Sequence, residues 1–322
     1  MENNNILKGV IYVALGASFY GMLATFVKIA YNSGYSTGEV TTAQFTIGIL
    51  GLLLLLFIRK LVQKKPIAKA SKKDILKLML AGTSYGGTSL CYYLAVQYID
   101  VSIAIVMLMQ SVWFSVVVES VLNKRLPSVK KVFATIIVLV GTVLATNVIN
   151  METSIHPRGI FWGILAAISY TITMFTANKI ATHLSPTKKS LYMLLGGSVI
   201  IISFLFFSQV GPTNFESIQL LYTEVTGKTP VVRPFNYSIF YTYGLFLAVF
   251  GTIIPPIFLN KGFPNAGLGL GSIVSSIELP VSVTMAYVLL NEKVMLIQWI
   301  GIAVILAAIV LMNWNKKIIS GN

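Results

Sequence analysis

Residues 262–291 read GFPNAGLGLGSIVSSIELPVSVTMAYVLLN, and Glu278 is the single charge in this stretch. A helix rises about 1.5 Å per residue, so about 20 apolar residues cross the hydrocarbon core of a membrane. The stretch lacks the short alternation of apolar and polar residues that a membrane-barrel strand would show. It therefore predicts a membrane-crossing helix with one acidic side chain near its middle.

Charge-free stretches of similar length recur along the 322 residues, at 9–27, 40–58, 78–99, 101–118, 132–151, 159–178, 190–215, 234–260 and 294–315. Because lipid offers no hydrogen bonds, a lipid-exposed segment must satisfy its own backbone as a helix. We therefore predict an all-α integral membrane protein with ten transmembrane helices. The segment at about 209–236 holds Gly, Pro, Thr and Asn and is expected to leave the bilayer as an extracytoplasmic loop.

The distribution of charge predicts how these helices are oriented. Charged residues make up 11% of the chain, against about 25% in an average soluble protein. A formal net charge of +14 would suggest nucleic acid as the partner of a soluble protein. With the N-terminus inside, however, 19 of the 24 Lys and Arg residues fall on the inner side and five on the outer side. Basic residues concentrate on the cytoplasmic side of membrane proteins, so both termini are predicted to be cytoplasmic and no nucleic acid is expected as a partner.

Residue types that carry enzyme chemistry are scarce. The chain has one cysteine, Cys91, and two histidines, His156 and His183. One cysteine excludes an intramolecular disulfide framework, and the set leaves little scope for a metal site. No nucleophile–base pair stands out, so we expect neither an enzyme nor a bound cofactor.

An internal repeat divides the chain into two halves. Ser, an aromatic residue, Thr and Lys-Ile-Ala recur at an offset of 151 between residues 18–30 and 169–181. A second correspondence, at an offset of 168, relates residues 121–123 to 289–291. The predicted repeats are residues 1–150 and 151–322, with five helices each. Because five is odd, the second half must enter the membrane from the opposite face, which is the inverted-repeat arrangement of many secondary transporters.

The stretch from Glu278 to Lys293, with Gln298 to Gly301, resembles the end of the second repeat in the EamA-like branch of the drug/metabolite transporter superfamily. The shared features are a Pro-containing helix, a Leu-rich stretch, a Glu followed by a basic residue, and Gln-x-x-Gly at the start of the last helix. The first-repeat counterpart departs from this pattern, with Lys124 in place of the Glu and Phe133 in place of the Gly. The resemblance implies a carrier of the inner membrane, often an exporter of amino acids, metabolites or drugs, and is silent on the substrate.

Glu278 is the strongest candidate for a substrate-binding and coupling residue. An ionised carboxylate at mid-membrane depth is costly unless it faces a wet cavity or a partner, and such a group suits proton coupling or recognition of a substrate amine. The alternative is that the carboxyl group of Glu278 has only a structural role and holds its helix to a neighbouring helix through a hydrogen bond. Pro280 cannot donate to the carbonyl of Ser276, which predicts a free carbonyl and makes Ser276 a candidate for substrate binding in a discontinuous helix, with Pro280 as a candidate hinge. Pro280 could equally serve only to bend the helix for packing.

The offset of 168 pairs Glu278 with Gln110, and we predict that the two side chains face each other across a central cavity. Trp113 lies three residues further on, on the same helix face, and would form an aromatic wall or pack in the core.

Three tyrosines and two prolines complete the candidate site. Tyr20 belongs to the first helix, and Tyr85 and Tyr92 to a third helix rich in Gly, Ser and Thr, whose small residues also suit close helix packing. Pro255 and Pro256 mark a kink for gating or packing.

These features predict a secondary active transporter that exports a small metabolite, such as an amino acid, or a drug-like amphipath by alternating access. Since Lys28 is the only basic residue within a helix core, phosphorylated substrates are disfavoured. A passive facilitator or channel, and a membrane receptor or assembly subunit without transport, remain open as alternatives. The expected partners are the lipid bilayer and a small molecule. Coupling to protons and a homodimer are left open.

Overall fold

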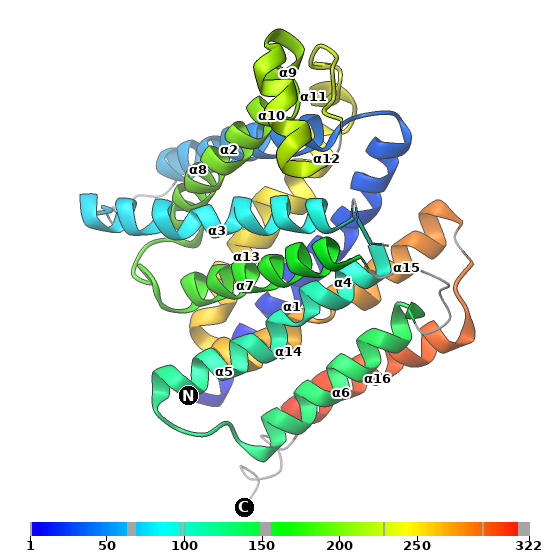
Figure 1. Ribbon diagram of the computed structural model, residues 1–322. Helices are drawn as coiled ribbons and strands as arrows, with labels where there is room; N and C mark the ends of the chain where they lie inside the picture. Colours follow the sequence, from blue (N-terminus) through cyan, green and yellow to red (C-terminus); the bar gives the residue numbers. More distant parts are fainter. Residues whose placement is uncertain are drawn as a thin grey trace, which may run out of the picture.

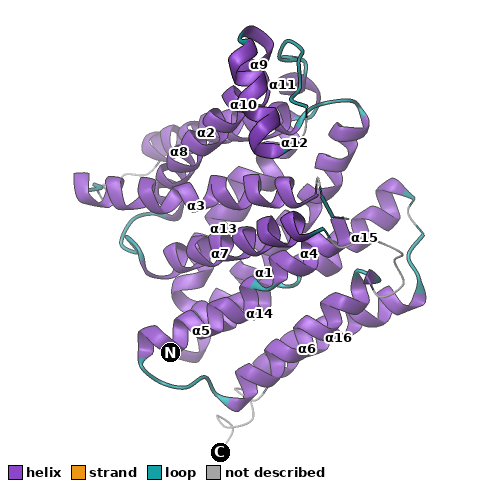
Figure 2. Ribbon diagram, in the orientation of Figure 1, coloured by secondary structure: helices purple, strands orange, loops and turns teal. Residues whose placement is uncertain are grey.

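Helices make up the regular structure of the computed structural model, which describes residues 2–62, 69–96, 98–99, 101–148, 156–227, 229–291 and 293–314. Figures 1 and 2 show these helices as one bundle, and the described ranges contain no strand. The first half of the chain holds α1 (Glu2–Asn32), α2 (Thr37–Val62), α3 (Lys72–Val96), α4 (Val101–Met109), α5 (Ser111–Asn123) and α6 (Val129–Ala145).

The second half begins with α7 (Pro157–Lys179) and α8 (Pro186–Leu205), which continues through the π-helical turn η2 (Phe206–Val210) into α9 (Gly211–Asn214). The remaining elements are α10 (Glu216–Thr226), α11 (Ile239–Thr242), α12 (Gly244–Ala248), the π-helical turn η3 (Val249–Ile253), α13 (Ile254–Ala266), α14 (Leu268–Ser275), α15 (Glu278–Leu290) and α16 (Leu296–Trp314).

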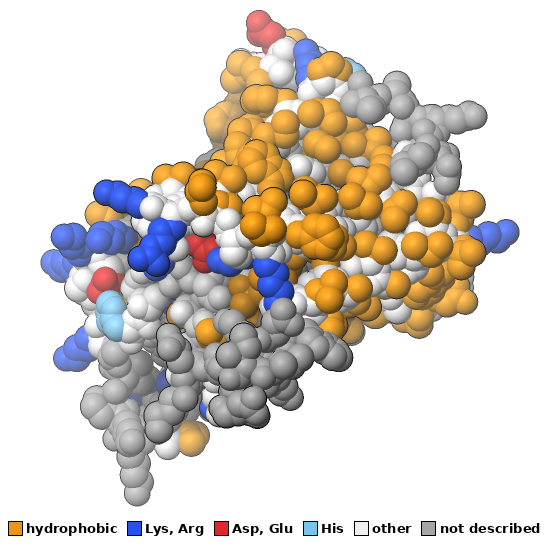
Figure 3. Space-filling view, turned by 90° about the horizontal axis from the view of Figure 1, so that it is seen from below, with side chains coloured by type: hydrophobic (Ala, Val, Ile, Leu, Met, Phe, Trp, Pro, Cys, Tyr) orange, Lys and Arg blue, Asp and Glu red, His pale blue; other side chains and the backbone are white. Residues whose placement is uncertain are grey.

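Seven helical stretches of the described residues are long and apolar enough to cross a membrane: Asn4–Asn32, Thr37–Val62, Ile103–Asn123, Pro157–Lys179, Pro186–Asn214, Gly244–Ala266 and Leu268–Leu290. A shorter apolar helix covers Leu296–Met312. Large apolar side chains such as Leu54, Leu80 and Ile202 point outward on the bundle. Figure 3 shows one face where hydrophobic side chains form a broad surface and most of the visible Lys and Arg gather toward one side. The prediction of an all-helical, multi-pass membrane protein is thus confirmed.

Packing between the helices is reciprocal when the two halves are exchanged. Under this exchange α1 corresponds to α7, α3 to α13, and the α4–α5 pair to the α14–α15 pair. Helix α1 packs against α13, α14 and α15, and α7 packs in the same way against α3, α4 and α5. Three further contacts, α2 with α8, α5 with α14 and α6 with α16, map onto themselves, and the last pair lies side by side in Figure 1.

Small residues allow several of these helices to approach closely. A Cβ on Gly82 of α3 would overlap the backbone of Met193 in α8, and one on Gly86 would meet the backbone of Gly197. Gly141 and Gly301 bring α6 and α16 together in the same way. Such close approach is typical of membrane helix interfaces. Close packing of the third helix, one of the two alternatives predicted for it, is therefore present.

The segment 209–236 is more ordered than the predicted loop. The helix that begins with α8 extends to Asn214, and α10 follows it. Glu39, which is fully buried at the start of α2, holds the end of the segment in place through hydrogen bonds. Its carboxylate accepts hydrogen bonds from Arg233 at 2.7 Å, Gln209 at 3.0 Å and the backbone N–H of Asn236 at 2.8 Å. A buried carboxylate needs such partners, and these three residues all come from the segment or its edge.

Candidate functional site

A cavity of about 450 Å³ lies between α1, α3, α4, α7 and α15. Its wall combines apolar side chains with tyrosines, and Glu278 is the only acidic side chain among the described residues that line it. The tyrosines are Tyr20, Tyr31, Tyr85, Tyr92, Tyr93 and Tyr170. Ring faces attract cations and hydroxyl groups donate or accept hydrogen bonds, so this wall suits a small molecule that is both apolar and positively charged.

Glu278 is the first residue of α15, directly after the interruption at Ser276–Ile277. The N-terminus of a helix favours a negative charge. The hydroxyl of Tyr170, on α7, donates a hydrogen bond to Glu278 Oε2 at 3.3 Å. The carboxylate of Glu278 thus contacts a neighbouring helix and also lines the cavity, and its role in substrate binding and coupling stays a prediction.

The cavity runs from Glu278 toward one end of the bundle. Lys28 and Asn32 line it near the end of α1, and Lys293 lines it after α15. Lys28 lies about two helical turns beyond Tyr20 on α1. These cations belong to the side that the charge distribution of the sequence predicts to be outside.

Three tyrosines that line the large cavity with Glu278 also line a second cavity, and we call Tyr20, Tyr85 and Tyr170 the tyrosine floor. The hydroxyls of Tyr20 and Tyr85 lie 2.6 Å apart, and Tyr85 donates to the carbonyl of Gly251 at 2.6 Å. Because a carbonyl can only accept, the single proton of the Tyr85 hydroxyl goes to Gly251, and Tyr20 must donate to Tyr85.

Two prolines leave the Gly251 carbonyl available to Tyr85. In an α-helix its donor would be the N–H of residue 255, and in a π-helix that of residue 256. Both positions are proline, Pro255 and Pro256, and proline has no N–H. The predicted irregularity at this pair is present as the π-helical turn η3 before α13, whereas a hinge motion there stays a prediction.

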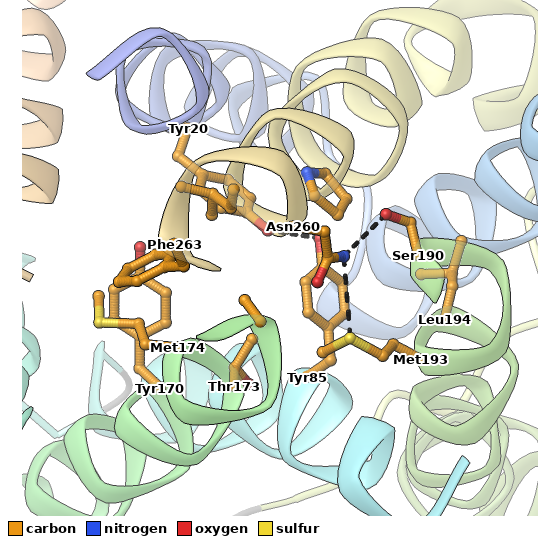
Figure 4. A pocket seen from close by; sticks show the side chains of 13 residues that line it. Tyr20, Tyr85, Tyr170, Thr173, Met174, Ser190, Met193, Leu194, Asn260 and Phe263 are labelled. Atoms are coloured by element: carbon orange, nitrogen blue, oxygen red, sulfur yellow. Dashed lines mark hydrogen bonds between the residues drawn. The ribbon is translucent and has the colours of Figure 1, made fainter. Parts of the chain in front are cut away.

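A second, much smaller cavity of about 10 Å³ is lined by the same three tyrosines, and Figure 4 shows the side chains around it. All three floor tyrosines and Thr173 line both cavities. The small cavity has room for about one water molecule. Its polar lining includes Asn260 of α13 and Ser190 of α8.

The structure brings together four of the predicted site residues, Glu278, Tyr20, Tyr85 and Tyr92, around the large cavity. Gln110 and Trp113 are not part of its lining. The expectation that Gln110 faces Glu278 across a cavity is wrong for a local reason. Gln110 Nε2 donates to the carbonyl of Val106 at 2.9 Å, and Trp113 Nε1 donates to Gln110 Oε1 at 2.9 Å. Both ends of the amide are thereby used within α4 and α5.

Ser276 also lies outside the lining of the cavity. It is fully buried, and its hydroxyl donates to the carbonyl of Ile273 at 2.6 Å. The Ser276 carbonyl, which was expected to be free for a ligand, accepts from the N–H of Leu279 at 3.2 Å. The predicted discontinuity is nevertheless present, and Pro280 lies in the first turn of α15, where a missing N–H costs little.

Several polar residues at or near the two cavities were missed from sequence. The sequence marks Tyr170 only as the aromatic residue of the second repeat, at the position of Phe19 in the first, although a tyrosine in mid-helix is a usable signal. Gln44 and Asn260 gave no signal, because single amides in apolar helices are common. Lys189 is one of the 19 basic residues assigned to the inner side, but it is buried in α8 and donates to the carbonyl of Ala177 at 2.8 Å. Within the described ranges, no group of three or more His, Cys, Asp or Glu side chains could hold a metal ion.

Comparison with known proteins identifies the fold and the family of this chain. A protein of Bacillus subtilis (strain 168) named as the uncharacterized transporter YcbK is 22% identical over 316 residues, covering 96% of this chain and 93% of that protein. One crystal structure superposes with a TM-score of 0.70 at 12% identity, covering 97% of this chain and 98% of the other, which shows a shared fold. The model of the EamA-like transporter family matches twice, over residues 7–147 and 157–314. The chain therefore belongs to the EamA-like transporter family and has its two-repeat architecture.

Proposed function

We propose that this protein is a secondary active transporter that exports small amine-bearing metabolites or amphipathic cations by alternating access. In this proposal the chain spans the inner membrane ten times as two inverted five-helix halves, with both termini in the cytoplasm. The large cavity is then the outward-open half of the transport path, and Glu278 at its inner end binds the substrate amine and exchanges it for a proton.

The observation that carries the proposal is the position of Glu278. A single carboxylate at the start of a half-helix, facing a cavity of about 450 Å³ and surrounded by tyrosines, is suited to a cation that is released in exchange for another. An acidic side chain at this depth in a membrane protein is otherwise costly. Lys28 and Lys293 near the other end of the cavity could accompany the carboxylate of an amino acid.

Two features support the inverted arrangement. Reciprocal contacts of α1 and α7 with the opposite half are what two equivalent halves would give. The odd number of predicted spans in each half, together with 19 inner and five outer basic residues, favours opposite insertion of the halves.

The tyrosine floor favours a carrier over a passive channel. The second cavity, which shares these tyrosines, holds only about 10 Å³, which favours a path that is not continuously open for a substrate. A carrier of this kind should show saturation and counterflow, which an open channel does not.

Glu278→Gln in proteoliposomes tests the proposal, with leucine, putrescine and 2-phenylethylammonium as probes under an imposed pH gradient. Removing the charge of a desolvated ion pair costs about 2–5 kcal/mol, so transport should fall at least about 30-fold and lose its dependence on the gradient. Glu119→Gln is the matched control, because Glu119 pairs with Lys131 and does not line the cavity. Unchanged rates and unchanged gradient dependence in Glu278→Gln would overturn the role of this residue.

A further inference from the structure

Asn260 holds a polar atom that the rest of the fold leaves without a partner. The residue is 5% exposed, and its Oδ1 has no hydrogen-bond partner among the described residues. A buried acceptor without a donor is costly, so such an atom in a pocket marks a position where a donor can bind.

The orientation of the amide is set by its neighbours. Asn260 Nδ2 donates to Ser190 Oγ at 2.9 Å and lies 3.9 Å from Met193 Sδ. Since a thioether sulfur only accepts, the NH2 group must face Met193 and the oxygen must face the other way. Figure 4 shows the nitrogen turned toward Ser190 and Met193 and the oxygen turned away from both, in a residue that lines the small cavity.

The surroundings of the oxygen favour a positively charged donor. Glu278 lies on the opposite side of the tyrosine floor, and the described lining of the small cavity contains no Lys or Arg. Lys189, next to Ser190 in the chain, directs its ammonium group to the Ala177 carbonyl. The small cavity therefore presents an acceptor and aromatic rings, which are the groups that bind an ammonium ion.

We propose that Asn260 is the inner recognition point of the transport path: when the tyrosine floor opens, its Oδ1 accepts a hydrogen bond from the ammonium group that Glu278 binds in the outward-open state. This inference rests on the proposed function and adds the requirement that the substrate carries an N–H donor. A cation that is recognised only by charge would not need Asn260.

Two cations with the same phenylethyl group and the same charge test the inference: 2-phenylethylammonium, which has three N–H donors, and trimethyl(2-phenylethyl)ammonium, in which three methyl groups replace them. Transport is measured in proteoliposomes whose protein exposes its cytoplasmic face. Asn260→Leu should raise the KM for 2-phenylethylammonium about tenfold, the effect of losing a hydrogen bond to a charged group. The KM for the trimethyl compound should stay within about twofold.

Asn260→Ala carries the same expectation and replaces Asn260→Leu if leucine prevents folding, because alanine adds no bulk. Gln44→Leu is the matched control. Gln44 is also buried and its Oε1 also lacks a partner, but it lines the large cavity above the floor. It should raise the KM at the outer face and leave the KM at the cytoplasmic face unchanged.

The outcomes separate the two proposals. If wild-type protein transports 2-phenylethylammonium and Asn260→Leu leaves its KM unchanged, or raises the KM of both cations equally, the inference about Asn260 is overturned alone. If wild-type protein transports neither cation and Glu278→Gln changes nothing for leucine or putrescine, the proposed function fails as well.

Discussion

The two halves of the molecule interrupt a helix at corresponding positions, Gln110 between α4 and α5 and Ser276–Ile277 between α14 and α15. At both breaks the backbone bonds tighten by one residue, with Gln110 N–H donating to Met107 and Ser276 N–H to Ile273. Both second segments also end on a left-handed residue, Lys124 at φ 50° and Asn291 at φ 53°. The backbone design is therefore repeated.

The side chains at the two breaks have different surroundings. Gln110 is held by its own helix pair, whereas Glu278 has a single hydrogen bond to Tyr170 among the described residues and faces a cavity. A repeated backbone thus supplies two possible sites, and local hydrogen bonding decides that only one is open to a ligand.

Exchanging the two side chains is the strongest test of this comparison. In Gln110→Glu/Glu278→Gln the carboxylate is kept but moved to the first break, where it does not line the cavity. Transport of 2-phenylethylammonium should stay reduced at least about 30-fold, as for Glu278→Gln alone. Recovery to near wild-type rates would show that the two breaks are interchangeable and contradict the comparison.

Gly21→Val should displace the backbone at the second break and leave the Glu278 side chain itself unchanged. A Cβ at Gly21 of α1 would overlap the backbone carbonyl of Glu278 and lie 2.9 Å from the Cβ of Val281. Overpacking of this kind costs about 1–3 kcal/mol, and the displaced α15 should also slow transport. Thermal unfolding in detergent and transport are the measurements. Ala24→Val, on the same helix at an exposed position, is the control for stability and should leave thermal unfolding near that of the wild-type protein.

Tyr85→Phe should lower the stability of the protein by removing the hydrogen bond between the tyrosine floor and η3, the turn that precedes α13. It leaves the Gly251 carbonyl without its donor, which costs about 1–3 kcal/mol for a buried group. Tyr20→Phe should cost less, about 0.5–1.5 kcal/mol, because Tyr85 still reaches Gly251. Thermal unfolding of both variants gives the order, and an equal or reversed order would contradict the assigned direction of the hydrogen bonds.

Trp113→Phe should have the smallest effect. It removes the indole N–H that holds Gln110 and keeps an aromatic ring, so the loss is about 0.5–1.5 kcal/mol of stability and little transport. If Trp113→Phe lowered transport as strongly as Glu278→Gln, the first break would also belong to the site.

The helices and Glu278 could be predicted from the sequence because the membrane permits few backbone structures and few charged side chains. Charge-free stretches predicted the helices because a membrane leaves few other structures, and Glu278 was found because a charge in such a stretch is conspicuous. Gln110 was misplaced because periodicity gives a helix face but not the rotamer that turns the amide to Trp113. The contact of Tyr85 with Gly251 depends on two prolines and on residues 166 positions apart, which no local pattern shows.

Asn260 illustrates a different limit. Its neighbour Lys261 ends the charge-free stretch 234–260, so the sequence predicts that Asn260 lies at the cytoplasmic end of a helix. Only the packing of α13 against α7 and α8 turns the amide toward the small cavity.

The hydrogen bonds that hold the amide of Gln110 affect how the two repeats can differ in sequence. Glutamine and glutamate codons differ by one base, so the first half is a single point mutation away from carrying a matching carboxylate. That mutation would place the acid against Trp113 and Val106, outside the cavity. A single mutation would therefore give both halves a carboxylate at the helix break. The halves would still differ, because the side chain at position 110 is held by residues of its own helix pair and does not line the cavity.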